Sequence, residues 1–409
     1  MKRGKERQRP DRDAPHVVII GAGFAGLSAV GALDSAGVRV TIVDRNLYCT
    51  FQPLLYQVAT GGLNPGDVAY PVGGFTARRR ARYLRGELAS VDAAGQRVKL
   101  ADGRELSYDY LVLAAGVSAA YFGVPGAAQN TFGLYTRADA IVLRDHVMAG
   151  FERMSAANGA SLDGSPGSAS AERDFAVTVV GGGATGVELA GTLGELRGTV
   201  LRATFPDVDP ARVHIRLVEM APALLMPFGE KLREYTRRQL VARGVDIHLG
   251  TEIREVRPSS VVLGDGRKVP SDLTVWAAGV AASPVVADWG LPQGKNGRIL
   301  VGPDLRVHGQ ERIFAAGDIA LDPDNPSPQL AQPALQEGRH VARQVRRLLA
   351  GQPPCRSSTT TRGSWPRSAG GRRWWSSPGD SGSPGRSPGS PGWACTCSTC
   401  WATATGSLP

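Results

Sequence analysis

The stretch Val17-Val-Ile-Ile-Gly21-Ala-Gly23-Phe-Ala-Gly26 joins a short apolar run to three closely spaced glycines. The apolar run predicts a buried strand, and the small residues that follow predict a helix over residues 27–33. In such a turn the first glycine permits a tight bend, the second lets a phosphate approach the backbone, and the third lets the helix pack on the strand. The stretch is therefore typical of a dinucleotide-binding turn.

The same arrangement occurs a second time, at Val177-Thr-Val-Val-Gly181-Gly-Gly183-Ala-Thr-Gly186. A further pair of matching segments follows the two turns, since residues 98–117 and 261–280 align without a gap and are identical at eleven of twenty positions. Each of these segments is typical of a hairpin at Asp-Gly followed by a buried strand that ends in Ala-Ala-Gly. Two copies in the same order predict an α/β fold with two Rossmann-like domains, each with a small β-meander.

An acidic residue ends the second predicted strand of each copy. Asp44 ends the run Thr41-Ile-Val-Asp44, and Glu219 ends the run Ile215-Arg-Leu-Val-Glu219. A carboxylate at this place is suited to bind the hydroxyls of a ribose. No arginine directly follows Glu219 to meet a 2′-phosphate, which favours NADH over NADPH at the second turn.

Two dinucleotide sites in one chain favour a flavoprotein, with FAD at one turn and NADH at the other. The late run Ile313-Phe-Ala-Ala-Gly317-Asp318 supports this, because an acid at a strand end beside a glycine can bind the flavin ribitol. We predict an FAD domain from residues 15–125 and 290–350, and an NADH domain over residues 126–289 inserted in it. The predicted cofactor-binding residues are Gly21, Gly23, Gly26, Asp44, Ala115, Gly116, Gly317 and Asp318 for FAD, and Gly181, Gly183, Gly186, Glu219, Ala278 and Gly279 for NADH.

The composition suits two folded domains, with 42% hydrophobic and 21% charged residues in a chain of 409. The net charge of +10 is concentrated at the ends, because residues 1–13 carry a surplus of three positive charges and residues 355–409 a surplus of five. The rest of the chain is nearly neutral. This distribution argues against a nucleic-acid-binding protein, which would carry its basic face on the folded body.

Several other classes of protein are excluded or disfavoured. No apolar run approaches the roughly 18 residues that a membrane-spanning helix needs. The basic N-terminus over residues 1–14, which we expect to be disordered, lacks the apolar segment of a signal peptide, so a cytoplasmic location is expected. Cys395, Cys397 and Cys400 lack a histidine and a fourth nearby ligand, so no metal site is predicted.

Three segments outside the turns carry a family resemblance: Phe51-Gln-Pro-Leu-Leu-Tyr-Gln-Val-Ala-Thr60, Gly186-Val-Glu-Leu-Ala-Gly191 and Ala331-Gln-Pro-Ala-Leu-Gln-Glu-Gly338. Together with the turns they resemble the type II, non-proton-pumping NADH:quinone dehydrogenases, flavoproteins related to the pyridine nucleotide-disulfide reductases. The resemblance covers roughly residues 15–354. It implies a respiratory enzyme that passes two electrons from NADH through FAD to a membrane quinone.

The resemblance also implies catalytic roles for three residues. Glu188 follows the second turn, where the family's glutamate is expected to support hydride transfer or protonation; the alternative is a first-turn glutamate favoured by the helix dipole. Gln332 and Gln336 are spaced to share a helix face and match the family's quinone motif; the alternative is a pair of solvent-facing glutamines. Cys49 has no second cysteine before Cys355, so a thiol relay of disulfide-reductase type is not expected, and we interpret it as a packed thiol.

Other functions remain open on the sequence alone. A ferredoxin- or rubredoxin-type reductase or an oxidase would share this architecture, and a nucleotide-binding redox sensor or inactive protein would share the turns. The glutamine pair favours quinone among these. A homodimer is possible, and the family's contact with the inner face of the cell membrane is expected where a family-like C-terminus is present.

The last part of the chain, residues 355–409, differs from everything before it. It is rich in Ser, Gly and Pro, holds five of the seven tryptophans, and has one branched aliphatic residue, Leu408. Such a composition predicts a disordered low-complexity tail. Reading the codons of residues 362–369 one nucleotide earlier permits Lys-Gly-Ile-Met-Ala-Thr-Ile-Gly, which resembles a family motif near the flavin. We therefore hypothesise a frameshift near residues 352–355, without which membrane docking by a C-terminal helix would be expected.

Overall fold

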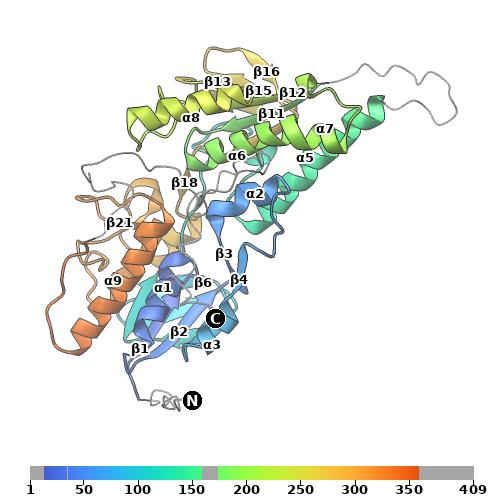
Figure 1. Cartoon of the computed structure of the whole chain (residues 1–409). Helices are drawn as coiled ribbons and strands as arrows, with labels where there is room; N and C mark the ends of the chain where they lie inside the picture. The colour runs from blue at the N-terminus through green and yellow to red at the C-terminus, as the bar shows by residue number, and fades with distance from the viewer. Residues whose placement is uncertain (1–12, 35, 159–173, 359–409) are drawn as a thin grey trace, which may run out of the picture.

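The computed structural model describes residues 13–34, 36–158 and 174–358. The predictions for the N-terminal segment and for most of the C-terminal tail fall outside these ranges. The described residues form two lobes, each built on a parallel sheet, with α2 (Leu55–Ala59) between them in Figure 1. The predicted α/β architecture with two nucleotide-binding folds is confirmed.

The first sheet has five parallel strands in the order β20-β9-β1-β2-β5. These strands are β1 (His16–Ile20), β2 (Arg39–Asp44), β5 (Arg82–Arg85), β9 (Tyr110–Leu113) and β20 (Ile313–Ala315). Strands β1 and β9 are almost wholly buried, because side chains from α1 and from residues 88–100 pack in one cluster with them. Strand β20 comes from the far end of the chain and pairs with β9, so the run that ends at Gly317-Asp318 lies beside the first turn.

The second sheet repeats the centre of the first, with four parallel strands in the order β13-β12-β11-β17. These are β11 (Phe175–Val180), β12 (Val213–Val218), β13 (Val245–His248) and β17 (Leu273–Trp276). Each lobe also has an antiparallel meander, formed by β6 (Leu88–Asp92), β7 (Arg97–Leu100) and β8 (Glu105–Ser107) in one and by β14 (Ile253–Arg257), β15 (Ser260–Leu263) and β16 (Lys268–Pro270) in the other. Gly103 and Gly266 both have φ +86° in the Asp-Gly hairpins, as the repeat predicted.

Helices follow each turn and pack along the sheets. Helix α1 (Phe24–Leu33) begins three residues earlier than predicted, and α6 (Ala184–Glu195) is its counterpart. Helix α5 (Arg137–Asn158) follows the first lobe, and α9 (Ala331–Leu349) carries Gln332 and Gln336, whose spacing predicted a shared helix face. The other helices are α3 (Val72–Ala77), α4 (Ala127–Asn130), α7 (Leu201–Thr204) and α8 (Glu230–Ala242).

Helix α9 packs directly on α1, and Figure 1 shows the two side by side in the first lobe. Gly338 makes this contact possible, because a Cβ there would lie 2.1 Å from the carbonyl oxygen of Ala25. Ser28 Oγ donates a hydrogen bond of 2.7 Å to the carbonyl of Leu335 across the same contact. The late helix is thereby fixed against the helix that begins at the first glycine turn.

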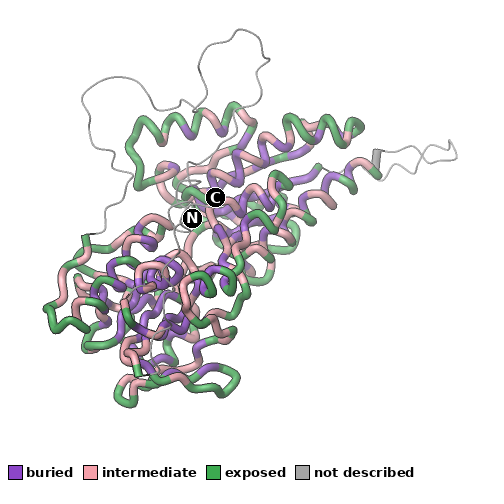
Figure 2. The backbone as a smooth tube through the Cα atoms, turned by 60° about the horizontal axis from the view of Figure 1, so that its bottom comes forward, coloured by how far each residue is buried: buried purple, intermediate pink, exposed green. Residues whose placement is uncertain are grey.

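Most buried residues fall into two large clusters, one inside each lobe, and a smaller third cluster includes Ile253 and Trp276. Figure 2 shows buried segments of the backbone in both lobes. One cluster surrounds the first sheet and includes Val341 and Val345 of α9. The other surrounds the second sheet, yet it includes Leu55 and Val58 of α2, which lie between strands of the first lobe in sequence. The predicted domain boundaries stay a prediction, and the 51–60 segment packs with the second lobe.

Three short strand pairings connect these parts. Strands β10 (Ser118–Ala119) and β18 (Val280–Ala281) pair antiparallel where the chain leaves the first lobe and returns to it. Strands β3 (Tyr48–Thr50) and β4 (Ala69–Pro71) bracket α2, and β19 (Ile299–Leu300) pairs with β21 (Ala320–Leu321) just after Asp318. In the described part of the chain no helix is both long and apolar enough to span a bilayer.

Candidate functional site

The first glycine of each turn is held against the end of the neighbouring strand. Gly21 has φ +101° and Gly181 has φ +112°, a region that other residues rarely adopt. A Cβ on Gly21 would lie 2.2 Å from the carbonyl oxygen of Ala114, and one on Gly181 would lie 2.5 Å from that of Ala277. Both the backbone angle and the close approach therefore require glycine at these two places.

The other two glycines of each turn divide into one crowded and one open position. A Cβ on Gly26 or on Gly186 would lie 1.9 Å from the carbonyl oxygen of the first glycine in its turn. At Gly23 and Gly183, by contrast, a Cβ would meet nothing within 4 Å. These two glycines are thus not required by the protein's own packing, and they leave space over the amino end of α1 and α6. That is the arrangement expected for a bound pyrophosphate.

The two predicted acids accept hydrogen bonds from the backbone of their turns in the same way. Asp44 accepts hydrogen bonds from the backbone N–H groups of Ala22 at 2.6 Å and Asn46 at 2.7 Å. Glu219 accepts from the N–H of Gly182 and, at 2.7 Å, from that of Ala221. Burial raises the pKa of Asp44, and the two backbone donors oppose that rise.

The Ala-Gly pairs of the repeat lie at the same turns. A Cβ on Gly21 would lie 2.9 Å from Cα of Ala115, and one on Gly181 would lie 2.7 Å from Cα of Ala278. Gly116 is needed for its φ of +68°, whereas Gly279 leaves room for the ring of Phe122, which a Cβ would approach to 2.7 Å. The structure therefore brings the predicted residues of each copy together around their own turn.

The turn Gly317-Asp318 lies at the end of β20, against the start of α1. Gly317 has φ +75°, and a Cβ there would lie 3.1 Å from Cβ of Ala25. Burial raises the pKa of Asp318 to about 6, and the positive charge of Arg298 opposes that rise. Asp318 thus joins Asp44 and the first glycine turn around one end of α1, as a site for a dinucleotide with a flavin would need.

Two charged residues beside this turn were missed by the sequence analysis. Glu337 is 3% exposed and accepts a hydrogen bond of 2.7 Å from the N–H of Gly317. Arg298 is 9% exposed and donates from Nε to the carbonyl of Asp318 at 2.9 Å. The spacing of Glu337 could have indicated its burial. It lies on the same helix face as Val341 and Val345, where a charged residue is unusual.

The three predicted catalytic residues lie on two helices from different lobes. Glu188 is half-buried in α6, where its backbone carbonyl accepts a hydrogen bond of 2.8 Å from Thr192 Oγ1. Gln332 and Gln336 are half-buried in the first two turns of α9, and Gln336 Nε2 donates to the carbonyl of Gln332 at 3.3 Å. Helix α2 packs against α6, so the 51–60 segment and Glu188 belong to one packed region.

Cys49 has the environment of a packing residue. Its thiol is buried in the first lobe, and burial raises its pKa to about 12. A thiol in this state is neutral near pH 7 and is a poor nucleophile. Across residues 13–34, 36–158 and 174–358 no group of three or more His, Cys, Asp or Glu side chains is arranged to hold a metal ion.

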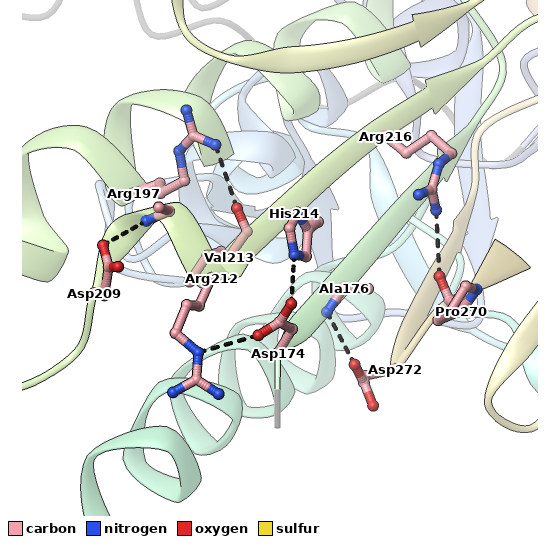
Figure 3. Close-up of polar contacts among 11 residues, drawn as sticks. Asp174, Ala176, Arg197, Asp209, Arg212, Val213, His214, Arg216, Pro270 and Asp272 are labelled. Carbon is pink, nitrogen blue, oxygen red and sulfur yellow. Dashed lines mark hydrogen bonds and ion pairs between the residues drawn. The ribbon is translucent and has the colours of Figure 1, made fainter. Parts of the chain in front are cut away.

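A second polar cluster lies at the opposite end of the second sheet. Figure 3 shows Asp174 accepting from Arg212 Nε at 3.1 Å and within 2.9 Å of His214 Nε2, while Ala176 donates to Asp272 at 2.9 Å. These groups lie where β11 begins, whereas ligands of parallel sheets bind where strands end. We therefore interpret the cluster as structural.

Comparisons with known proteins agree with this geometry. The family described as Pyridine nucleotide-disulphide oxidoreductase matches residues 15–338. A type II NADH:quinone oxidoreductase of Mycobacterium tuberculosis is 36% identical over 349 residues, which is 82% of this chain and 72% of that protein. A protein of the same description from Staphylococcus aureus is 30% identical over 352 residues, covering 83% of this chain and 84% of its own length.

Solved structures show the same fold. The structure of NDH2 from Plasmodium falciparum in complex with NADH has a TM-score of 0.73 at 19% identity, with 81% of this chain and 83% of that chain covered. The sulfide:quinone oxidoreductase of Aquifex aeolicus has a TM-score of 0.69 at 18% identity, with 83% and 78% covered. With its twin turns, paired acids and family match, this chain belongs to the pyridine nucleotide-disulphide oxidoreductases and, within them, to the type II NADH:quinone oxidoreductases.

Proposed function

We propose that this chain binds FAD at the first turn and NADH at the second, and passes two electrons from NADH to a quinone without pumping protons. The observation that carries the proposal is the open position at Gly23 and Gly183, in turns whose other glycines are tightly packed. Bound FAD supplies the redox chemistry, because it accepts two electrons from NADH and returns them to an acceptor. The residues of the chain bind, orient and exclude water.

The two cofactors would be held by matching sets of groups. The backbone of each turn and the amino end of α1 or α6 bind a pyrophosphate, and Asp44 or Glu219 binds a ribose. Asp318 would accept hydrogen bonds from the flavin ribitol. The absence of a dithiol beside Cys49 in the described residues leaves this member of the family without the thiol relay that disulfide reduction needs.

For the acceptor we propose a quinone bound at Gln332 and Gln336. These amides lie at the amino end of α9, which packs on α1 beside the proposed flavin turn, and they can donate to a quinone carbonyl without adding charge. Glu188 would support the proton or hydride step from the α6 side. A homodimer and a place at the inner face of the cell membrane stay predictions of the family resemblance.

One surface feature supports contact with a membrane. One face of α9 continues from the two half-buried glutamines into three exposed arginines, at steps of three or four residues: Gln332, Gln336, Arg339, Arg343 and Arg346. Within the described residues, none of the ion pairs includes Arg339 or Arg343. A cationic strip that ends at the proposed quinone site would attract anionic lipid headgroups.

The purified protein offers a direct test. We expect it to be yellow, to lose its visible flavin absorbance with NADH under anaerobic conditions, and to regain it with a short-chain quinone. Gln336→Ala should raise the KM for quinone by about tenfold, the value of one to two hydrogen bonds, and leave the rate with ferricyanide unchanged. Reduction of a ferredoxin in place of quinone would overturn the assignment of the acceptor, and a colourless protein would overturn the flavin assignment.

A further inference from the structure

The turn at Gly317-Asp318 is held from two sides by buried charged side chains. Glu337 reaches it from α9, where its Oε2 accepts the N–H of Gly317 at 2.7 Å. Arg298 reaches it from the segment before β19, where Nε donates to the carbonyl of Asp318 at 2.9 Å and the guanidinium also donates to the carbonyl of Ala320. Together they bond three backbone groups in four consecutive residues.

Because both side chains are buried, loss of their hydrogen bonds would destabilise the folded protein. Glu337 and Arg298 are 3% and 9% exposed, so each has given up most of its hydration. A buried charge is tolerated only when it is bonded to polar groups or to an opposite charge. Glu337 bonds the N–H of Gly317 and the side chain of Ser327, and Arg298 bonds the carbonyls of Asp318 and Ala320, so most of these bonds go to one turn. The arrangement favours a role in fixing that turn.

The position of Glu337 in α9 extends this role. Glu337 directly follows Gln336 and precedes Gly338, which packs closely against the backbone of Ala25 in α1. A hydrogen bond from Glu337 to Gly317 therefore ties the helix that carries the glutamines to the turn that carries Asp318. A shift of either element would move the other, since both are packed on α1.

We propose that Glu337 and Arg298 are positioning residues: they hold Asp318 toward the flavin ribitol and hold α9 so that Gln336 faces the acceptor. This inference rests on the proposed function. It assigns a shared scaffold to the flavin site and the acceptor site on the first lobe, whereas the NADH site on the second lobe does not depend on it.

The test compares Glu337→Ala with Glu337→Gln, with the exposed Glu311→Gln as a matched control. Glu337→Gln keeps an acceptor for Gly317 N–H and loses the charge. We expect the FAD dissociation constant to rise about tenfold or more in Glu337→Ala and by less in Glu337→Gln, since one hydrogen bond to a charged group is lost in the first and replaced in the second. Arg298→Lys, which keeps the charge without the two-pronged donor, should also weaken FAD binding.

Kinetic measurements separate a positioning role of Glu337 from a purely structural one. With FAD added to saturation, we expect Glu337→Ala to keep the wild-type KM for NADH and to show a raised KM for a short-chain quinone. A wild-type KM for quinone and a wild-type FAD dissociation constant in both Glu337 variants would overturn the inference. If Glu337→Ala does not fold, Glu337→Gln and Arg298→Lys carry the test. Failure of the wild-type protein to reduce quinone would instead overturn the proposed function, and the FAD measurements would still decide the role of Glu337.

Discussion

The two glycine turns are close copies of each other, but their surroundings differ. In both, the first glycine has φ above +100°, and a Cβ on the third would lie 1.9 Å from the carbonyl oxygen of the first. In both, an acid accepts a hydrogen bond from the N–H of the residue between the first and second glycines. The first turn, however, has the extra strand β20 beside it, with Asp318, Glu337 and Arg298. At the same edge of the second sheet the described residues form an isolated parallel bridge, from Phe132 to Val275, in place of a strand.

This difference shows how one duplicated cradle, meaning a glycine turn with its acid, can bind two different cofactors. The shared part recognises what the two cofactors share, a pyrophosphate and a ribose. The added strand supplies contacts for a further part of the ligand and brings α9 against the turn. A cofactor bound by both sets of contacts would be retained, and one bound by the cradle alone would exchange. We therefore expect FAD to be resident and NADH to come and go.

The largest effect is expected from adding one methyl group to each cradle in turn. Because a Cβ would meet a backbone carbonyl oxygen at 1.9 Å in either turn, Gly26→Ala and Gly186→Ala each force the helix away from the strand. Overpacking of this kind costs about 1–3 kcal/mol, so affinity should fall about tenfold or more. Gly26→Ala should lose FAD, whereas Gly186→Ala should stay yellow and show a raised KM for NADH.

The flavin content after purification and the steady-state KM for NADH check this prediction. Gly73→Ala is a suitable control, since a Cβ at Gly73 would meet nothing within 4 Å. Loss of flavin from Gly186→Ala at normal thermal stability would contradict the assignment of the two turns.

A smaller effect is expected from neutralising the acids. Glu219 and Asp44 each accept two backbone hydrogen bonds, so an amide keeps part of the geometry while the charge that favours the ribose hydroxyls is lost. Glu219→Gln should raise the KM for NADH about tenfold, since hydrogen bonds to charged groups contribute about 1.5–3 kcal/mol. Asp44→Asn should weaken FAD instead. The exposed Glu230→Gln serves as the control, and equal loss of NADH affinity in Asp44→Asn and Glu219→Gln would refute separate sites.

Much of this comparison was readable from the sequence. The repeat predicted both turns, both acids and the hairpins at Gly103 and Gly266, because steric and φ requirements leave glycine few substitutes. It also aligned Asp109 with Asp272, and these prove to bind equivalent backbone N–H groups, of His16 at 2.7 Å and Ala176 at 2.9 Å. Local chemistry that depends on one backbone conformation leaves a clear pattern.

Long-range packing left no such pattern. The sequence did not show that Leu55 and Val58 would join the core of the second lobe, because any apolar residue at those positions fits either core. It did not identify Glu337 or Arg298, whose roles depend on burial against a turn about twenty residues away in the chain. The domain boundaries and the catalytic roles of Glu188, Gln332 and Gln336 stay predictions.

Asp318, which follows the added strand of the first lobe, should make the free energy of unfolding depend on pH. Because burial raises the pKa of Asp318 from 3.8 to about 6, the folded protein prefers the protonated acid more than the unfolded chain does. This contribution to the free energy of unfolding is present below pH 3.8 and is lost as the pH rises through about 6. Asp318→Asn should therefore gain stability relative to wild type by about 1–2 kcal/mol between pH 4 and pH 7.5.

Urea unfolding of the FAD-free proteins at the two pH values measures this change. Asp324→Asn, at an exposed acid in the same region, should show no such change. A stability difference between Asp318→Asn and wild type that is the same at both pH values would show that Asp318 is not strained by burial.

The smallest effect is expected at Cys49. The residue five positions after Asp44 is Cys49, and the residue five positions after Glu219 is Leu224; both are buried, at 6% and 1% exposed. This correspondence favours packing as the role of the thiol. Cys49→Ala should lower the free energy of unfolding by about 1 kcal/mol and leave NADH oxidation unchanged. A large loss of activity at unchanged flavin content would restore a redox role for the thiol.

The central claim is that the two turns hold two different cofactors at once. Anaerobic titration of the yellow protein with NADH, followed by separation of bound from free nucleotide, tests it most directly. We predict one FAD per chain that stays with the protein, complete loss of flavin absorbance with one equivalent of NADH, and release of the oxidised nicotinamide on passage through a desalting column. Competition of NADH with FAD for a single site would contradict the account.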